Sequence, residues 1–136
     1  SRGLGDVYKR QLSWLPVLFF LLPKFYGRTL HKLVSFTQHA GLARDIKDHR
    51  YTTREMYLNP ILSFLYWKME YHVTHHMFPT VPSYNLDKLH HHIKDQLPRT
   101  NDGLIDAYKE ILPALMKQKD DSSYFFKKEV PEPQNA

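Results

Sequence analysis

The sequence predicts an all-α chain, in which a truncated membrane helix is followed by a helical portion and a disordered C-terminal tail. Three observations lead to this fold class. Apolar residues recur at helical spacing in several segments, no segment shows the alternation of a β-strand, and one run is almost wholly apolar. A length of 136 residues suffices for one domain with a modest core. We expect that domain to occupy residues 12–118.

The N-terminal residues fall into two parts. Residues 1–11 are polar and contain glycine; they are either a non-native extension, such as translated sequencing-adapter sequence, or a native loop. Residues 12–23 supply only about half of the roughly 20 apolar residues that a membrane span needs, so a short buried or interfacial helix is the alternative. Aromatic and basic residues near the end of this run favour the truncated span: Trp14, Lys24, Tyr26 and Arg28.

The middle of the chain predicts a helix, a connection and a second helix. Residues 30–41 have the pattern of a helix with Gly41 as its stop, and residues 44–54 are charged enough to form a solvated connection. Asn59 then fits an N-cap and Pro60 the first helical position of a helix that runs to about Met77. The first half of this helix is so apolar that we expect it to be buried in protein or lipid.

Two more helices and a tail complete the prediction. A helix beginning near Asn85 carries an apolar stripe formed by Leu86, Leu89, Ile93 and Leu97. Another helix runs from about Asn101 to Gln118 and should be kinked by Pro113. Its inward residues are predicted to be Leu104, Ala107, Tyr108, Ile111, Leu112 and Leu115. Residues 119–136 are polar and contain prolines, which predicts a disordered tail.

The composition limits the partners and cofactors. A formal net charge of +5 suits an anionic membrane surface or an acidic protein, and no nucleic-acid-binding motif accompanies it, so we expect no nucleic-acid partner. The absence of cysteine excludes disulfides, iron–sulfur clusters and cysteine-ligated zinc. Nine histidines are present, and any bound metal must therefore be held by nitrogen and oxygen.

The most informative motif is an HxxHH arrangement formed by His72, His75 and His76. On a helix these offsets place the three imidazoles within roughly 100° of arc on one face. Three neutral imidazoles can hold a transition metal and leave coordination positions open. The alternatives are an exposed polar face near a helix end and a closed zinc site. A zinc site needs a fourth ligand, and no HExxH metalloprotease motif is present.

The histidine run lies within a longer string that resembles the C-terminal third of the membrane fatty acid desaturases. The string comprises Asn59-Pro60 and residues 64–67, 71–79 and 81–82, preceded by residues 38–42, 48–50 and 53–54. The resemblance covers about residues 30–98, and it is specific for the family but not for the substrate.

The resemblance implies an integral-membrane oxidoreductase whose active site faces the cytosol and whose two iron ions are held almost wholly by histidines. It implies that His72, His75 and His76 are ligands from the last histidine box. His39 is the candidate for a further ligand, and a hydrogen bond between helices is the alternative for this residue. No catalytic or cofactor-binding residue beyond the metal ligands is expected.

The resemblance also implies partners. Electrons from a ferredoxin or a b-type cytochrome, together with dioxygen, would introduce a double bond into an acyl-lipid or acyl-CoA substrate at the membrane. Glu70 and Asp45 are candidates for outer carboxylates that orient the imidazoles. The basic residues of the charged connection form either a solvated face or a docking site for the electron donor: Arg44, Lys47, Arg50 and Arg54.

The remaining histidines are expected to have no role at the metal. His49 is predicted to be structural or exposed. His90, His91 and His92 spread over about 200° of a helix and cannot converge on one ion. His90 flanks the apolar stripe, and the other two are expected to face solvent.

The chain has neither the HxxxH box nor the earlier HxxHH box that the desaturases have upstream. We therefore expect it to be the C-terminal part of a longer enzyme and to be inactive alone, whereas the intact enzyme would be active. Three alternatives stay open: a hydroxylase of the same di-iron superfamily, a non-catalytic membrane-associated helical module, and a small soluble zinc protein.

Overall fold

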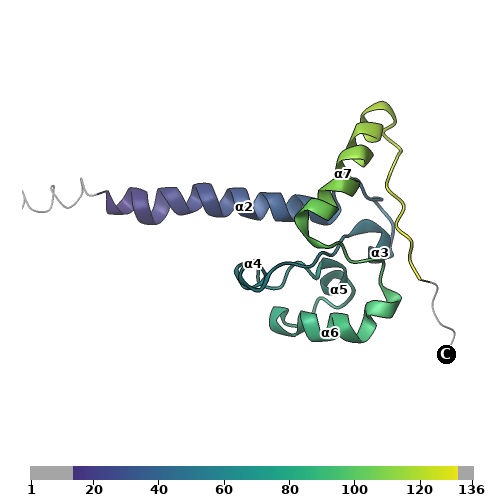
Figure 1. Ribbon diagram of the computed structural model, residues 1–136, viewed down its shortest axis with the longest axis horizontal. Coiled ribbons are helices and arrows are strands. Elements are labelled where there is room, and N and C mark those ends of the chain that lie inside the picture. Colours follow the sequence, from purple (N-terminus) through teal and green to yellow (C-terminus); the bar gives the residue numbers. More distant parts are fainter. Residues whose placement is uncertain (1–13, 132–136) are drawn as a thin grey trace, which may run out of the picture. The chain divides into compact units, whose positions relative to one another are not determined.

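The computed structural model describes residues 14–131 as helices joined by turns and irregular segments (Figure 1). Within this range there is no named strand, and an isolated parallel bridge joins Met56 to Asn101. The all-α prediction is therefore confirmed. The chain divides into two compact units, Ser1–Leu33 and Val34–Ala136. The interpretation of residues 1–11 lies outside the described residues.

In the first unit, a π-helical turn, η1 at Val17–Leu21, leads directly into α2 at Leu22–His39. The helix thus begins upstream of the predicted residue 30. It includes Pro23, the last residue of the apolar run. Across residues 14–131 no helix combines the length and the apolarity that are needed to cross a bilayer, so the predicted truncated span is not confirmed.

The end of α2 belongs to the second unit and follows the prediction. The helix stops at His39, and Gly41 adopts a left-handed φ of 73°. A side chain would be strained there, and a Cβ atom on Gly41 would approach the Cβ of Ala114 to 2.9 Å. Gly41 therefore ends the helix and also lets the chain pass close to α7, which spans Gly103–Asp120.

The charged connection is less exposed than the sequence predicts. It contains a short helix, α3 at His49–Thr52, and the Asp48 side chain accepts a hydrogen bond from the Arg50 backbone nitrogen at 3.0 Å. Residues 53–56 are buried, and Arg54 is 0% exposed. The prediction of a solvated connection is wrong for this end, because the Arg54 charge finds partners inside the unit.

The predicted helix from Asn59 to Met77 is broken into two. The first part is α4 at Pro60–Leu65, and the Asn59 side chain caps it as predicted, accepting from the Leu62 backbone nitrogen at 2.9 Å. This part is not buried in protein among the described residues, since Ile61, Phe64 and Leu65 are 73%, 78% and 64% exposed, and its burial in lipid stays a prediction.

The break lies at Trp67 and Lys68, which both have a φ of 59°. Two successive left-handed residues cannot continue a right-handed helix. A separate helix, α5 at His72–Met77, then carries the HxxHH motif. The continuous apolar pattern gave no signal of this interruption.

The last two predicted helices are present. They are α6 at Leu86–Ile93, flanked by 3₁₀ turns at Ser83–Asn85 and Lys94–Gln96, and α7. Helix α5 lies between α3 and α6 (Figure 1). The prediction of an inward Leu112 is wrong, since it is 52% exposed and Ala114 is buried in its place.

The hydrophobic core joins α2, the Met56 segment and α7. Its buried members are Val34, Met56, Ala107 and Ile111. This core fixes the end of α2 against segments that come later in the chain, and it thereby sets where His39 stands.

The predicted disordered tail differs from the structure over residues 119–131. Lys119 and Asp120 complete α7, and the Phe126 backbone nitrogen donates to the Gly41 carbonyl oxygen at 2.7 Å. Lys128 is buried. Amino-acid composition does not indicate a single backbone hydrogen bond or a single buried side chain, and the sequence therefore did not predict these contacts. The rest of the predicted tail, residues 132–136, lies outside the described residues.

Candidate metal centre

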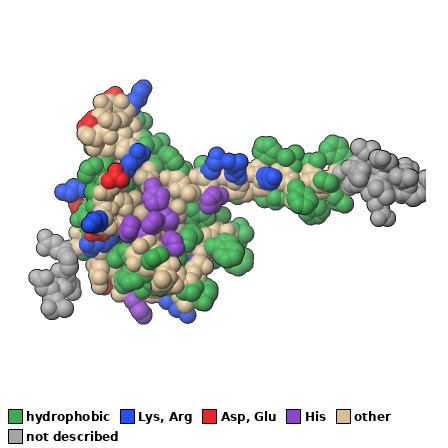
Figure 2. Space-filling model, turned by 180° about the vertical axis from the view of Figure 1, so that it is seen from behind, with side chains coloured by type: hydrophobic (Ala, Val, Ile, Leu, Met, Phe, Trp, Pro, Cys, Tyr) green, Lys and Arg blue, Asp and Glu red, His purple; other side chains and the backbone are tan. Residues whose placement is uncertain are grey.

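Two helices distant in the sequence bring three histidines together. His39 is the last residue of α2, and His72 and His76 stand one turn apart on α5. The Nε2 atom of His72 lies 3.0 Å from the Nε2 atom of His39 and 3.0 Å from that of His76. We call these residues the histidine cluster. Figure 2 shows histidine side chains gathered on one face of the second unit.

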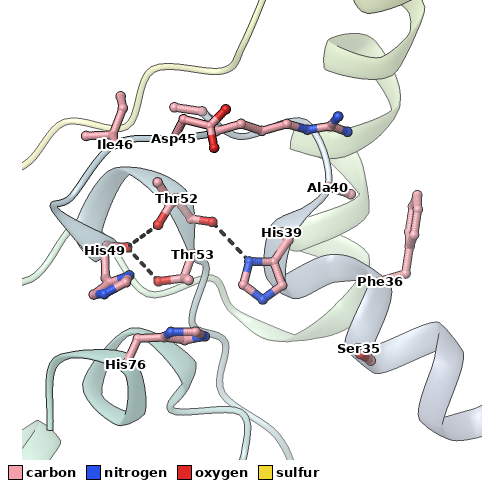
Figure 3. Close-up of a pocket in the computed structure, with 12 residues that line it drawn as sticks. Ser35, Phe36, His39, Ala40, Asp45, Ile46, His49, Thr52, Thr53 and His76 are labelled. Carbon is pink, nitrogen blue, oxygen red and sulfur yellow. Dashed lines mark hydrogen bonds between the residues drawn. The ribbon is translucent and has the colours of Figure 1, made fainter. Parts of the chain in front are cut away.

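Hydrogen bonding within the cluster locates one proton. Nδ1 of His39 lies 3.1 Å from the carbonyl oxygen of Thr52 (Figure 3). A carbonyl oxygen only accepts, so Nδ1 carries the hydrogen, and in the neutral imidazole Nε2 keeps a lone pair. If Nε2 of His39 accepts, Nε2 of His72 must carry the hydrogen and donate it. An Nε2 atom that carries a hydrogen has no lone pair, so it cannot accept a hydrogen bond from His76. Only one of the two 3.0 Å contacts can be a well-formed hydrogen bond.

This arrangement fits a metal ion better than it fits hydrogen bonding alone. Two imidazole nitrogens that each lie about 2.1 Å from a metal, at right angles, are about 3.0 Å apart. The hydrogen bond from His39 to the Thr52 carbonyl is also of the kind that orients a ligating histidine. The Nδ1 atom of His75 is buried without a hydrogen-bond partner among the described residues and so has a lone pair or a hydrogen that no protein group uses. The Nδ1 atom of His72 also has no such partner, but it is not the atom that faces the cluster.

The environment keeps His72 and His76 in the form that binds metal. Burial, reinforced by the neighbouring His76, lowers the pKa of His72 to about 3. Burial and the nearby His49 also lower the pKa of His76. Both imidazoles are therefore uncharged at neutral pH, and an uncharged imidazole is the form that donates a lone pair to a metal.

His75 and His49 lie beside the cluster. The ring centroid of His75 is 6.0 Å from that of His72, and His75 is not among the three histidines whose nitrogens converge. The ring of His49 lies 4.9 Å from that of His76. A pocket of about 600 Å³ opens over His39, His49 and His76, with Thr52 and Thr53 in its wall (Figure 3).

Arg54 holds the backbone on both sides of His39. Its Nη1 donates to the carbonyl oxygens of Thr37, at 2.6 Å, and Ala40, at 3.1 Å. These carbonyls are at the end of α2, where a helix has no partners of its own for them. The Nε of Arg54 pairs with Glu110 on α7 at 3.2 Å. Arg54 thus ties the His39 end of α2 to α7.

A sequence model of the fatty acid desaturase family matches residues 11–108, which include every residue of the histidine cluster. The chain belongs to the fatty acid desaturase family. The chain is also 34% identical, over 69 residues, to the Delta(6)-fatty-acid desaturase fat-3 of Caenorhabditis elegans. That alignment covers 47% of this chain and 16% of the relative. No solved structure matches the chain significantly.

The two carboxylates expected to orient the imidazoles make no hydrogen bond to the cluster among the described residues. Glu70 is buried, and its carboxylate accepts from the hydroxyl of Ser63. Asp45 is exposed and has a left-handed φ of 58°. Among residues 14–131, no hydrogen bond joins either carboxylate to a histidine of the cluster, so neither orients the imidazoles in the way the sequence suggested.

Two of the four basic residues expected to form a docking site for the electron donor are not available for that role. Arg54 is buried and cannot meet another protein, and Arg50 forms an ion pair with Asp48 at 2.7 Å. Arg44 and Lys47 stay exposed. The electron-donor role of this segment stays a prediction, supported by fewer residues than before.

Sequence reasoning missed Arg54, Glu55, Thr74 and His90 as supports of the site. His91 and His92 are exposed as predicted, but His90 is 1% exposed and lies 2.9 Å from Glu55. The apolar stripe of α6 was the available signal for His90, because position 90 falls one turn after Leu86 on the buried side. No local signal marked the others, since their partners are distant in the chain.

Proposed function

We propose that this chain contributes part of a histidine-ligated di-iron centre that introduces a double bond into an acyl chain. The observation that carries the proposal is the convergence of three Nε2 atoms, from α2 and α5, in a member of the fatty acid desaturase family. His39, His72 and His76 would share one metal ion. His75, with its unpartnered Nδ1, is the fourth proposed ligand.

Iron supplies the chemistry that side chains lack, because it can bind dioxygen and take up electrons. In the overall reaction, two hydrogens leave adjacent carbons of the acyl chain. Dioxygen, two electrons and two protons from solution complete the balance, and two water molecules form. A ferredoxin or a b-type cytochrome is the proposed source of the electrons, and acyl-lipid or acyl-CoA is the proposed substrate, held at a membrane.

The residues of this chain have the roles of binding and orienting. The Thr52 carbonyl fixes the ring of His39, so that Nε2 faces the cluster. The absence of charge on His72 and His76 leaves their nitrogens available to the metal. Cysteine is absent from the whole chain, so the proposed donor set contains no thiolate that dioxygen could oxidise.

Product analysis of the full-length protein tests the proposal. The protein is expressed in a host that lacks the activity, and the acyl chains are analysed by gas chromatography and mass spectrometry. We expect new unsaturated chains with the wild type and with His92→Ala, and none with His76→Ala. Hydroxylated products would favour the hydroxylase alternative, and an unchanged product from His76→Ala would favour the non-catalytic module.

We also propose that the 136-residue chain is inactive by itself, because its four proposed ligands make up only part of a two-iron centre. Turnover by the purified chain would contradict this part of the proposal.

A further inference from the structure

A carboxylate from outside α5 holds this helix. The Oε1 atom of Glu55 accepts hydrogen bonds from the backbone nitrogen and from the hydroxyl of Thr74, each at 2.6 Å. The N-cap residue of α5, Tyr71, makes no side-chain capping hydrogen bond. The first N–H groups of a helix have no partner within it, so Glu55 supplies an acceptor that α5 itself lacks.

The other oxygen of Glu55 faces His90 on α6. Nδ1 of His90 lies 2.9 Å from Oε2 of Glu55, and both side chains are 2% exposed. The two atoms lack the alignment of a hydrogen bond, and neither has a hydrogen-bond partner among the described residues. On its far side, Nε2 of His90 lies 3.4 Å from the hydroxyl of Tyr57. A buried carboxylate is costly unless a partner lies beside it, and His90 is the side chain that lies within ion-pair distance of Oε2.

Thr74 stands between the histidines of the motif and is 0% exposed. Helix α5 has only six residues, and a helix so short has little stability of its own. Its position must therefore come from tertiary contacts. A rotation of α5 about its axis would carry His72 and His76 away from His39, and the two hydrogen bonds between Glu55 and Thr74 oppose that rotation.

We propose that Glu55, with His90 as its buried partner, is a positioning residue that fixes α5 so that the motif histidines meet His39. The inference rests on the metal-binding role proposed above. Glu55 acts through Thr74 and the helix backbone, in contrast to an outer carboxylate bonded directly to an imidazole. The His-His-His tract of α6 thereby contributes to the site through its first member, although none of its three residues joins the cluster.

Cobalt titration of the metal-free, full-length protein tests the proposal, with the visible absorption bands of Co²⁺ as the readout. We expect Glu55→Gln and His90→Gln to weaken Co²⁺ binding by about 10- to 100-fold and to change the shape of the bands. His92→Gln, on the exposed side of the same helix, and Glu129→Gln, at an exposed site, are the matched controls and should bind as the wild type does.

A pair of variants at Thr74 separates positioning from a general loss of stability. Thr74→Val keeps the shape of the side chain and deletes the hydroxyl, whereas Thr74→Ser keeps the hydroxyl and deletes a methyl group. We expect weaker Co²⁺ binding with valine and wild-type binding with serine. If the variants acted only by lowering stability, Thr74→Ser, which leaves a cavity, would bind Co²⁺ no more tightly than Thr74→Val does.

Wild-type affinity and wild-type bands in Thr74→Val, or in a folded Glu55→Gln, would overturn the positioning role. Should Glu55→Gln not fold, the Thr74 pair decides. His72→Ala is titrated alongside. If His72→Ala keeps the Co²⁺ bands, His72 is not a ligand and the proposed metal centre is wrong. If His72→Ala loses the bands while the Glu55 and Thr74 variants keep them, only the positioning role is wrong.

Discussion

Lys128 illustrates how a single buried charge affects this unit. The side chain is buried, and among the described residues its Nζ has two long hydrogen bonds, to the Arg99 carbonyl oxygen at 3.5 Å and to Oδ1 of Asn101 at 3.4 Å. Burial, with Arg54 as the next cause, lowers the pKa of Lys128 from 10.5 to about 8. The folded chain therefore releases this proton at a lower pH than the unfolded chain does.

We predict that Lys128→Met is more stable than the wild type below pH 8 and that the difference closes as the pH rises to 10.5. Between these values the unfolded state binds more protons, so the wild type gains stability as pH increases. The gain should be on the order of 3 kcal/mol. Urea unfolding of both proteins across this pH range measures it, with Lys127→Met at the exposed neighbouring position as the control. A stability difference between Lys128→Met and the wild type that stays constant with pH would contradict the lowered pKa of Lys128.

Charged residues also mark where sequence reasoning about the site fails. Charge ordinarily indicates exposure, but Arg54 and Glu55 are buried beside distant groups that bond to part of each side chain: Glu110 and the end of α2 for Arg54, and Thr74 for Glu55. Such partners are separated along the chain and leave no periodic pattern. The histidine motif, in contrast, is local, and the sequence correctly predicted that it lies on a helix ending at about Met77, although it did not predict where that helix begins.

At the scale of elements, local signals predicted the helix ends well. The Asn59 cap, Pro60 at the first helical position and the stop at Gly41 are all present, because each depends on the conformation of one or two residues. The break between α4 and α5 was not predicted. It is held in part by Gln38 on α2, whose Nε2 donates to the Met69 carbonyl oxygen at 2.8 Å. A contact across that sequence distance cannot be read from local pattern.

The turn after α2 gives a prediction about elements. Gly41→Ala should lower the free energy of unfolding by about 2 kcal/mol, because alanine is strained at a φ of 73° and its Cβ would lie 2.9 Å from the Cβ of Ala114. Gly27→Ala is the matched control. A Cβ there meets nothing within 4 Å, and alanine should stabilise α2 by about 0.5–1 kcal/mol.

Thermal unfolding followed by circular dichroism compares the two glycine variants. Equal effects of the two substitutions would show that neither the left-handed conformation nor the close approach to α7 matters at Gly41.

At the scale of the whole molecule, the site depends on segments that are far apart in sequence. The end of α2 supplies His39, the segment around Arg54 and Glu55 holds both helices, and α5 supplies His72 and His76. Family membership indicated the last histidine box and the extra histidine, but only the structure brings the three nitrogens together. It also leaves His75 outside this group.

The most direct test of the central claim is the iron content of the purified full-length protein, measured by inductively coupled plasma mass spectrometry. If α2 and α5 bind one metal ion together, His39→Ala and His72→Ala each lose most of the iron, while His92→Ala keeps the wild-type content. Circular dichroism confirms that the variants are folded. Wild-type iron in folded His39→Ala and His72→Ala would contradict the claim that these histidines form the metal centre.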